Sequence, residues 1–343
     1  MNPFTFSAPV DVAAALQQAG MGVPGKTKFI AGGTNLIDLM KEHVETPGSL
    51  VDINHLPFAL IEPSPIGGLL IGAMVRNADT AYHPLVRQHY PLLSQAILAG
   101  ASAQIRNMAS NGGNLLQRTR CVYFYDVAVP CNKRRPGSGC PAIGGLSRQH
   151  AILGASDKCI ATHPSDMCVA LAALQAIVHV RSSDGSRQIA FTDFHRLPGD
   201  RPDIDTSLAD GELITHIELP PAQQFANHYT YLKLRDRASY AFALVSVAVA
   251  LDIADDGSIH EARIALGGVA HKPWRLPQAE ALLTGELPTS AAFVRAADYL
   301  LKDAQGQGGN NFKLSMAHRA VVRALETAAA SPEQNPDATE VAT

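Results

Sequence analysis

The chain has 343 residues and a formal net charge of −3, so it carries no excess of basic residues that would indicate nucleic acid or an anionic membrane surface as its partner. Hydrophobic residues make up 46% of the chain and charged residues 17%, and the absence of any run of about 18 apolar residues excludes a transmembrane helix. The first residues lack a basic segment and include Asp11, so we expect no signal peptide and a cytoplasmic chain.

The first part of the chain, residues 1–221, is predicted to be a domain of short strands and helices. Up to residue 109, strands are expected over residues 4–7, 28–31, 49–53, 58–61, 69–71 and 103–109, and helices over residues 10–19, 36–43 and 77–100, the last broken at Pro84 and Pro91. Further on we expect a strand at residues 151–154, a helix from His163 to about Leu174 capped by Ser165 or Asp166, and strands over residues 176–182, 188–192 and 213–219.

Two glycine pairs follow predicted strands. Gly32-Gly33 comes after the strand at residues 28–31, and Gly112-Gly113 after the strand at residues 103–109. A strand, a glycine turn and a helix start can cradle a phosphate, because the backbone approaches closely and its N–H groups bind oxyanions. Neither pair has the dinucleotide spacing G-x-G-x-x-G, and an ordinary tight turn explains each equally well.

Four of the five cysteines lie in one stretch rich in proline and glycine, which we call the cysteine loop (about residues 115–160). Cys121, Cys131, Cys140 and Cys159 have the spacing C-x9-C-x8-C-x18-C. They are ordinary buried thiols, a disulfide pair or the ligands of a metal centre. The tight C-x2–4-C pairs that are typical of zinc are missing, which favours a [4Fe–4S] cluster. The fifth, Cys168, lies in an apolar helical run and is expected to face the core.

The second part, residues 222–330, begins after Pro220-Pro221. Strands are predicted over residues 229–235, 243–253 and 262–267, and helices over residues 277–283, 290–303 and 311–330. This order predicts a three-stranded antiparallel sheet covered by helices, so that the whole chain is of the α+β class. Residues 331–343 are polar and contain proline, which indicates a disordered tail.

The motifs 31–35, 110–114 and 165–166, together with Lys233, resemble the FAD contacts of the flavin subunit of the xanthine dehydrogenase family. The resemblance covers nearly the whole chain and implies the fold of the vanillyl-alcohol oxidase (PCMH-type) FAD-binding domain. The cysteine loop is similar to that of bacterial aldehyde oxidoreductases of this family, whose FAD-binding subunit carries a [4Fe–4S] cluster.

The resemblance also implies the site residues. Those around the pyrophosphate and ribityl chain of FAD would be Lys28, Phe29, Ile30, Ala31, Gly32, Gly33, Thr34, Asn35, Leu36, Ser110, Asn111, Gly112, Gly113 and Asn114. Asp166, Gly100 and Ile214 would line the cavity, and Lys233 would lie near the isoalloxazine, although Gly100 departs from the bulky aromatic of some members. Cys121, Cys131, Cys140 and Cys159 would hold the cluster, and no catalytic residue is expected.

The family's division of labour implies an electron-transfer role. A large partner subunit would hold molybdopterin and oxidise an aldehyde to a carboxylic acid, and a small partner would hold [2Fe–2S] clusters. This chain would complete a heterotrimer and pass electrons through FAD to a terminal acceptor. A partner with an export signal would make the complex periplasmic.

Two other interpretations stay open. One is a stand-alone flavin oxidase of the vanillyl-alcohol oxidase type, with His163 or Tyr240 as the base. The other is a zinc-containing scaffold subunit.

Overall fold

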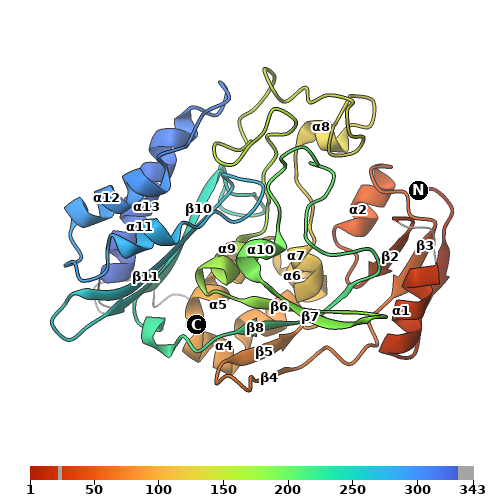
Figure 1. Cartoon of the computed structure of the whole chain (residues 1–343), viewed down its shortest axis with the longest axis horizontal. Coiled ribbons are helices and arrows are strands. Elements are labelled where there is room, and N and C mark those ends of the chain that lie inside the picture. Colours follow the sequence, from red (N-terminus) through yellow and green to blue (C-terminus); the bar gives the residue numbers. More distant parts are fainter. Residues whose placement is uncertain (22–24, 331–343) are drawn as a thin grey trace.

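Three β-sheets organise the chain, and the computed structural model describes it over residues 1–21 and 25–330 (Figure 1). The first sheet is parallel, with the order β1-β3-β2, formed by Thr5–Ser7, Ser49–Asp52 and Thr27–Ile30. Helix α1, Val12–Met21, buries Ala15 and Leu16 against this sheet. Helix α2, Leu36–Lys41, follows β2 after the first glycine pair.

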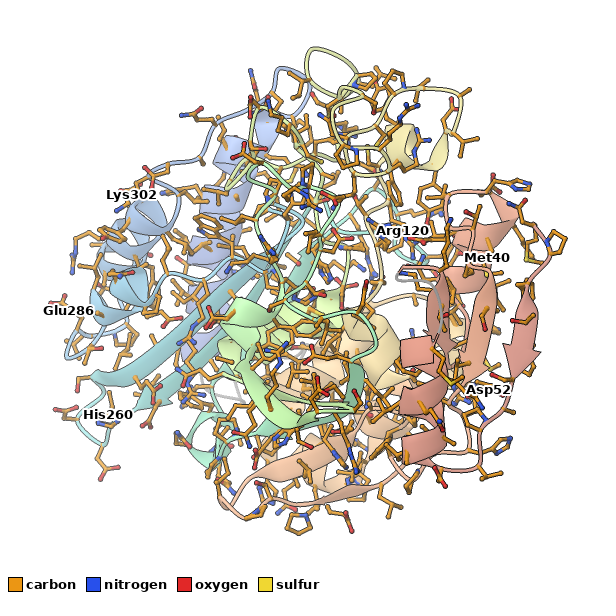
Figure 2. The ribbon with its side chains drawn as sticks, turned by 45° about the vertical axis from the view of Figure 1, so that its right-hand side comes forward. Met40, Asp52, Arg120, His260, Glu286 and Lys302 are labelled. Atoms are coloured by element: carbon orange, nitrogen blue, oxygen red, sulfur yellow. The ribbon has the colours of Figure 1, made fainter. Side chains whose placement is uncertain are left out.

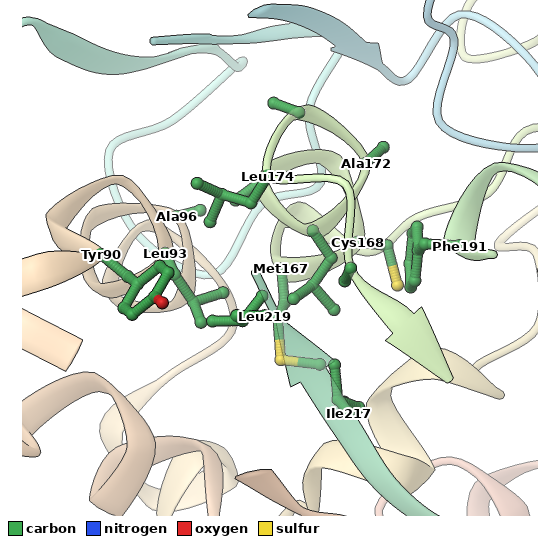
Figure 3. Close-up of a cluster of buried hydrophobic side chains, with 14 of the residues drawn as sticks. Tyr90, Leu93, Ala96, Met167, Cys168, Ala172, Leu174, Phe191, Ile217 and Leu219 are labelled. Carbon is green, nitrogen blue, oxygen red and sulfur yellow. The ribbon is translucent and has the colours of Figure 1, made fainter. Parts of the chain in front are cut away.

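The second sheet is antiparallel and has the order β4-β5-β8-β6-β7. Its strands are Ile61–Pro63, Leu69–Gly72, Leu213–Leu219, Ile177–Ser182 and Gly185–Ala190. Helices α5, Pro91–Ala99, and α9, Asp166–Ala173, share its core. Figure 3 shows Leu219 of β8 beside Leu93 of α5, and Ile217 beside Met167 of α9.

The predicted break of residues 77–100 at two prolines is confirmed. The segment forms α3, Asn77–Tyr82, α4, Pro84–His89, and α5. Pro84 and Pro91 each occupy the start of a helix, where the missing N–H is not needed.

The prediction of a strand over residues 103–109 is wrong, because residues Ala103–Met108 form helix α6. Ser102 caps this helix by accepting a hydrogen bond from the Ile105 N–H at 3.3 Å. The second glycine pair then lies inside a short helix, α7, Asn111–Leu115, which Ser110 caps in the same way. Two serine caps close together therefore outweigh the apolar pattern that indicated a strand.

Two other predicted strands differ from the structure. The strand expected over residues 58–61 is found as β4, three residues later. Residues 151–154 form no strand, because the N–H groups of Ile152 and Leu153 both donate to one carbonyl, that of Val269, at 2.9 and 3.0 Å.

The third sheet confirms the antiparallel arrangement predicted for residues 222–330. Strands β9, Tyr229–Leu234, β10, Val245–Ile253, and β11, Ile259–Gly267, have the order β11-β10-β9. Its helices are α11, Pro277–Ala281, α12, Ser290–Leu300, and α13, Phe312–Ala329. In Figure 2, His260, Glu286 and Lys302 mark this end of the molecule, and Met40 and Asp52 mark the opposite end.

The two faces of this third sheet pack against different parts of the protein. Val247, Val249 and Leu266 face the helices α11–α13, whereas Ala248 and Ala265 belong to the core that contains α5 and α9. Neighbouring residues of a strand point to opposite faces, so alternation of valine and alanine serves both contacts. The small alanine side chains let the sheet approach α5 and α9 closely.

The cysteine loop connects α7 to α9 and contains one short helix, α8, Val122–Tyr125. Figure 1 shows it as an irregular arch at one end of the molecule, above α9 and α10, Phe191–Phe194. Among the described residues no helix is long and apolar enough to cross a bilayer. The tail at residues 331–343, predicted to be disordered, lies outside the described residues.

Candidate functional site

The two glycine segments lie against each other. A Cβ atom on Gly32 would lie 2.0 Å from the carbonyl oxygen of Met108 and 3.3 Å from the Cα of Ala109, so only glycine fits there. Gly33 has a φ of 71°, in the left-handed region, and turns the chain toward α2. Residues 31–35 are therefore in backbone contact with Met108 and Ala109, which directly precede the segment 110–114 that the sequence assigned to the same cofactor.

Arg76 and Asn54 fasten this contact, and the sequence analysis missed both. Arg76 Nη1 donates to the Met108 carbonyl at 2.6 Å, and Nη2 donates to Asn54 Oδ1 at 3.2 Å. Asn54 Nδ2 in turn donates to the Ala31 carbonyl at 3.1 Å. No local sequence signal marks these residues, because their partners are distant in the chain.

Asn35 has an unused donor at the same place. Its Oδ1 accepts a hydrogen bond from the Arg118 N–H at 2.9 Å. Its Nδ2 is buried and has no hydrogen-bond partner among the described residues. A buried donor left unpaired is costly, and an oxyanion such as a phosphate oxygen would satisfy it. The residues present therefore fit the diphosphate of FAD.

The asparagine side chains of the second segment point into the protein. Asn77 Nδ2 donates to Asn111 Oδ1 at 2.8 Å, and Asn114 Nδ2 donates to Asn77 Oδ1 at 2.7 Å. Ser165 Oγ donates to Asn114 Oδ1 at 2.5 Å. These amides hold α7 to α3 and α9. The contact with a cofactor that is expected for residues 110–114 must therefore be made by their backbone atoms.

The remaining residues assigned to FAD flank these segments. Lys28, Phe29 and Ile30 are half-buried on β2. Ile214 is 5% exposed on β8, in the main core. The neighbouring carbonyl of Thr215 accepts a hydrogen bond from the Ala73 N–H, and the Ala73 carbonyl accepts one from the Gly112 N–H, both at 2.8 Å.

Asp166, Lys233 and Gly100 meet where α5 ends and α9 begins. Lys233 Nζ donates to Asp166 Oδ2 at 2.8 Å and to the Ala99 carbonyl at 3.0 Å. Tyr231, which the sequence did not indicate, donates its hydroxyl to Asp166 Oδ1 at 2.6 Å. A Cβ on Gly100 would lie 3.1 Å from Asp166 Oδ2. Burial raises the pKa of Asp166 against the opposing effect of Lys233.

A pocket opens beside Asp166 and is lined by residues from three parts of the chain. Ser165 and Asp166 come from the start of α9, Cys121 and His150 from the cysteine loop, and Phe242 from the segment between β9 and β10. The pocket is therefore a meeting point of the first domain, the cysteine loop and the third sheet.

All four cysteines of the loop line a second, smaller cavity. The thiol of Cys159 donates a hydrogen bond that lowers the pKa of Cys140 to about 6, while the same contact raises the pKa of Cys159 itself. Burial raises the pKa of Cys121 to about 11. The structure describes all five cysteines, and none is in a disulfide. Cys168 is fully buried in the main core beside Phe191, as predicted (Figure 3).

The four thiols line one cavity, and those of Cys140 and Cys159 are in hydrogen-bond contact. Around one zinc ion, bonds of about 2.3 Å put thiolate sulfurs roughly 3.8 Å apart. Among the described residues, the only group of potential ligand atoms all within 4.8 Å of one another is His163, Cys168 and His195. No three of the loop cysteines meet that limit, so in this arrangement one ion would not bind three of them at once.

His163, a candidate base, is buried against His195, with ring centroids 4.2 Å apart. His195 Nε2 donates to the Leu115 carbonyl at 2.8 Å. Burial lowers the pKa of His163 well below its usual value and that of His195 to about 4, so both rings are neutral. Tyr240, the other candidate base, is 59% exposed.

A partly buried ion cluster joins the cysteine loop to the segment before β8. Arg118 Nε lies 2.8 Å from Asp205 Oδ2, and Lys133 Nζ pairs with Asp205 Oδ1. Lys133 also donates to the Pro202 carbonyl at 2.8 Å. Burial acts to raise the pKa of Asp205, but the charges of Lys133 and Arg118 outweigh it and hold that pKa far below its usual value.

Comparison with known proteins agrees with this geometry. One family, described as the FAD binding domain in molybdopterin dehydrogenase, matches residues 2–222, and another, the CO dehydrogenase flavoprotein C-terminal domain, matches residues 229–328. The chain is 51% identical to the aldehyde oxidoreductase FAD-binding subunit PaoB of Escherichia coli, over 96% of this chain and 99% of that protein. It is 28% identical to the glyceraldehyde dehydrogenase medium chain of Sulfolobus acidocaldarius, over 90% and 89% of the two chains.

Solved structures give the same result. The fold matches carbon monoxide dehydrogenase from Hydrogenophaga pseudoflava with a TM-score of 0.74 and 26% identity, covering 95% of this chain and 97% of that one. It matches quinoline 2-oxidoreductase from Pseudomonas putida 86 with a TM-score of 0.71 and 25% identity, over 96% and 97%.

Proposed function

The chain belongs to the FAD-binding subunits of the xanthine dehydrogenase (molybdenum hydroxylase) family, and on this premise we propose that it is the electron-transfer subunit of a molybdenum-dependent aldehyde oxidoreductase. In this role it receives electrons from partner subunits that oxidise an aldehyde to a carboxylic acid, and passes them to a terminal acceptor. The identity of 51% to an aldehyde oxidoreductase subunit, over nearly the full length of both chains, supports this choice of substrate class.

FAD would lie along the joined glycine segments and reach toward Asp166. FAD supplies the chemistry, because a flavin exchanges electrons singly or in pairs. Gly32 and Gly33 let the backbone approach the diphosphate, and Asn35 Nδ2 offers a donor to it. Lys233 places a positive charge beside the pocket, which favours an anionic flavin.

The four loop cysteines would hold a [4Fe–4S] cluster. The observation that carries this part of the proposal is that Cys121, Cys131, Cys140 and Cys159 all line one cavity, which adjoins the pocket beside Asp166. Four thiolates are the usual ligand set of such a cluster. Lys133 lines the same cavity, and its positive charge acts to lower the pKa of Cys159 and so favours a thiolate there.

The cysteine loop also offers a surface for partner subunits. Its exposed large apolar side chains are Leu116, Val122, Val127, Ile143 and Leu146, with exposed fractions between 42% and 79%. Apolar side chains gathered on an exposed loop are typical of an interaction site. We propose a heterotrimer with a large molybdopterin subunit and a small [2Fe–2S] subunit.

A stand-alone oxidase finds less support. It requires a base above the flavin, but His163 is packed against His195 and is only 9% exposed. The domain division at residues 221 and 222 stays a prediction.

The test is a cysteine series in the full complex, with iron and FAD measured per chain. Serine in place of Cys121, Cys131, Cys140 or Cys159 should each lower the iron content, because metal binding is coupled to folding of such a loop. The control, Cys168→Ser, should keep about four iron atoms beyond those of the partner clusters. This chain purified alone should reduce no dye with any aldehyde.

Two results would contradict the proposal. Loss of iron in Cys168→Ser with full iron in Cys159→Ser would refute the ligand assignment. Aldehyde turnover by the isolated chain would refute the electron-transfer role.

A further inference from the structure

His150 touches a cysteine of the loop with its ring nitrogen. His150 Nε2 lies 3.1 Å from Cys121 Sγ, and the residue is 5% exposed. Its other nitrogen, Nδ1, has no hydrogen-bond partner among the described residues. A thiolate can only accept a hydrogen bond, so a ring in contact with a metal-bound Cys121 must carry its proton on Nε2.

The position of His150 is fixed from the far side by α13. Its carbonyl accepts hydrogen bonds from Asn310 Nδ2 at 3.0 Å and from Lys313 Nζ at 3.1 Å, and its N–H donates to the Ser147 carbonyl at 3.0 Å. Asn310 and Lys313 are both fully buried. The backbone of His150 is therefore fixed beside Cys121 by the C-terminal part of the chain and does not depend on the loop alone.

His150 also lies between the two cavities. The residues that line both the pocket beside Asp166 and the cavity of the four cysteines are Thr119, Cys121 and His150. Cys121 is thus the ligand on the flavin side of the proposed cluster, and His150 is its neighbour in the shared wall.

We propose that His150 is a positioning residue that donates its Nε2 proton to the Cys121 thiolate and raises the reduction potential of the [4Fe–4S] cluster. The inference rests on the proposed function, because it requires the cluster. A donor to a ligand sulfur stabilises the additional negative charge of the reduced cluster more than it stabilises the oxidised one. The cluster takes up and releases one electron, and the proton stays on His150 throughout.

The test uses three variants of this chain in the full complex. His150→Phe keeps a flat ring without a donor, and His150→Gln keeps an N–H near the position of Nε2. The matched control is His216→Phe, a histidine of β8 that packs edge-on against Phe58 at 5.3 Å, away from the cysteines. Each is measured for iron, for FAD and for the cluster midpoint potential by redox titration with low-temperature electron paramagnetic resonance.

We expect His150→Phe to lower the potential by about 59 mV, a tenfold change in the one-electron equilibrium. His150→Gln should restore most of the shift, and His216→Phe should show none. Full iron with an unchanged potential in His150→Phe would overturn the inference alone. Loss of iron in both His150 variants would overturn it in favour of His150 as a ligand or a folding requirement. A wild-type complex without iron beyond that of its partner clusters would remove the proposed cluster, and the inference with it.

Discussion

Gly32 leaves no room for a side chain because it is in direct backbone contact with Met108 and Ala109, the residues just before the second glycine segment. The Met108 carbonyl occupies the place of its Cβ, and the same oxygen accepts a hydrogen bond from Arg76. Any side chain at position 32 must push apart the residues proposed to hold the diphosphate of FAD.

We therefore expect Gly32→Ala to lose FAD and to lower the free energy of unfolding by about 1–3 kcal/mol, the usual cost of overpacking. Gly20→Ala is the control, because a Cβ at Gly20 meets no atom within 4 Å. FAD per chain after gel filtration, with a guanidinium chloride unfolding curve, measures both effects. Full FAD content in Gly32→Ala would show that the glycine segments do not hold the cofactor.

Some residues of the site could be predicted from the sequence, and others could not, for a physical reason. Asp166 and Lys233 were expected at one site and form an ion pair of 2.8 Å. Arg76 and Tyr231 were not expected, although each donates to a residue of the site or its support. Their roles depend only on partners distant in the chain, which leave no trace in local pattern or composition.

Among the elements, α6 and α7 show where pattern misleads. Residues 103–109 contain apolar side chains at spacings that fit a strand as well as a helix, and short runs are ambiguous in this way. The hydroxyls of Ser102 and Ser110 each accept a hydrogen bond from an N–H of the following turn, and these caps favour helix over strand. By contrast, Pro84 and Pro91 gave correct helix starts, because proline constrains the backbone by itself.

Ser165 makes two hydrogen bonds at the start of α9, one as the cap of that helix and one to α7. Its Oγ accepts from the Cys168 N–H at 3.1 Å and donates to Asn114 Oδ1 at 2.5 Å. We expect Ser165→Ala to lower the free energy of unfolding by about 1–2 kcal/mol and also to weaken FAD binding, because α7 loses its tie to α9.

Thr289→Ala is the matched control for this cap. Thr289 accepts from the Ala292 N–H at 3.3 Å at the start of α12, far from the site. Thr289→Ala should lower the free energy of unfolding by a similar amount, about 1 kcal/mol, and should leave the affinity for FAD unchanged. Equal FAD affinity in the two variants, by fluorescence titration, would argue against a role of α9 in holding the cofactor.

For the whole molecule, the cysteine loop is the joint between the other parts. Arg118 reaches Glu45 beyond α2 at 2.6 Å, and Arg148 reaches Asp236 beyond β9 at 2.7 Å. The sequence predicted the loop and the convergence of its cysteines, since proline and glycine exclude regular structure there. It did not predict these ion pairs, because charged residues scattered over the surface carry no information on their partners.

The cluster of Asp205, Lys133 and Arg118 makes this joint depend on pH. The side chain of Lys133 is 2% exposed and that of Asp205 30%, so Asp205→Asn leaves a buried cation without its charge partner. We expect Asp205→Asn to lower the free energy of unfolding by roughly 3 kcal/mol at pH 7, the lower end for breaking a buried pair.

The pKa of Asp205 in the folded protein is held below its value in the unfolded chain, about 3.9, so the unfolded state binds more protons at low pH. The stabilisation is then complete above about pH 4 and is lost as the pH falls further.

The measurement compares guanidinium chloride midpoints of the wild type and Asp205→Asn at pH 7 and pH 3. The difference between the two proteins should shrink at pH 3, because the unfolded wild type then binds a proton at Asp205 that the folded wild type does not, and part of the stabilisation is lost. Asp203→Asn is the control, since Asp203 pairs with Arg201, whose side chain is 58% exposed, and such surface pairs contribute about 0–1 kcal/mol. An equal difference between wild type and Asp205→Asn at both pH values would show that packing around residue 205, and not its charge, holds the cysteine loop in place.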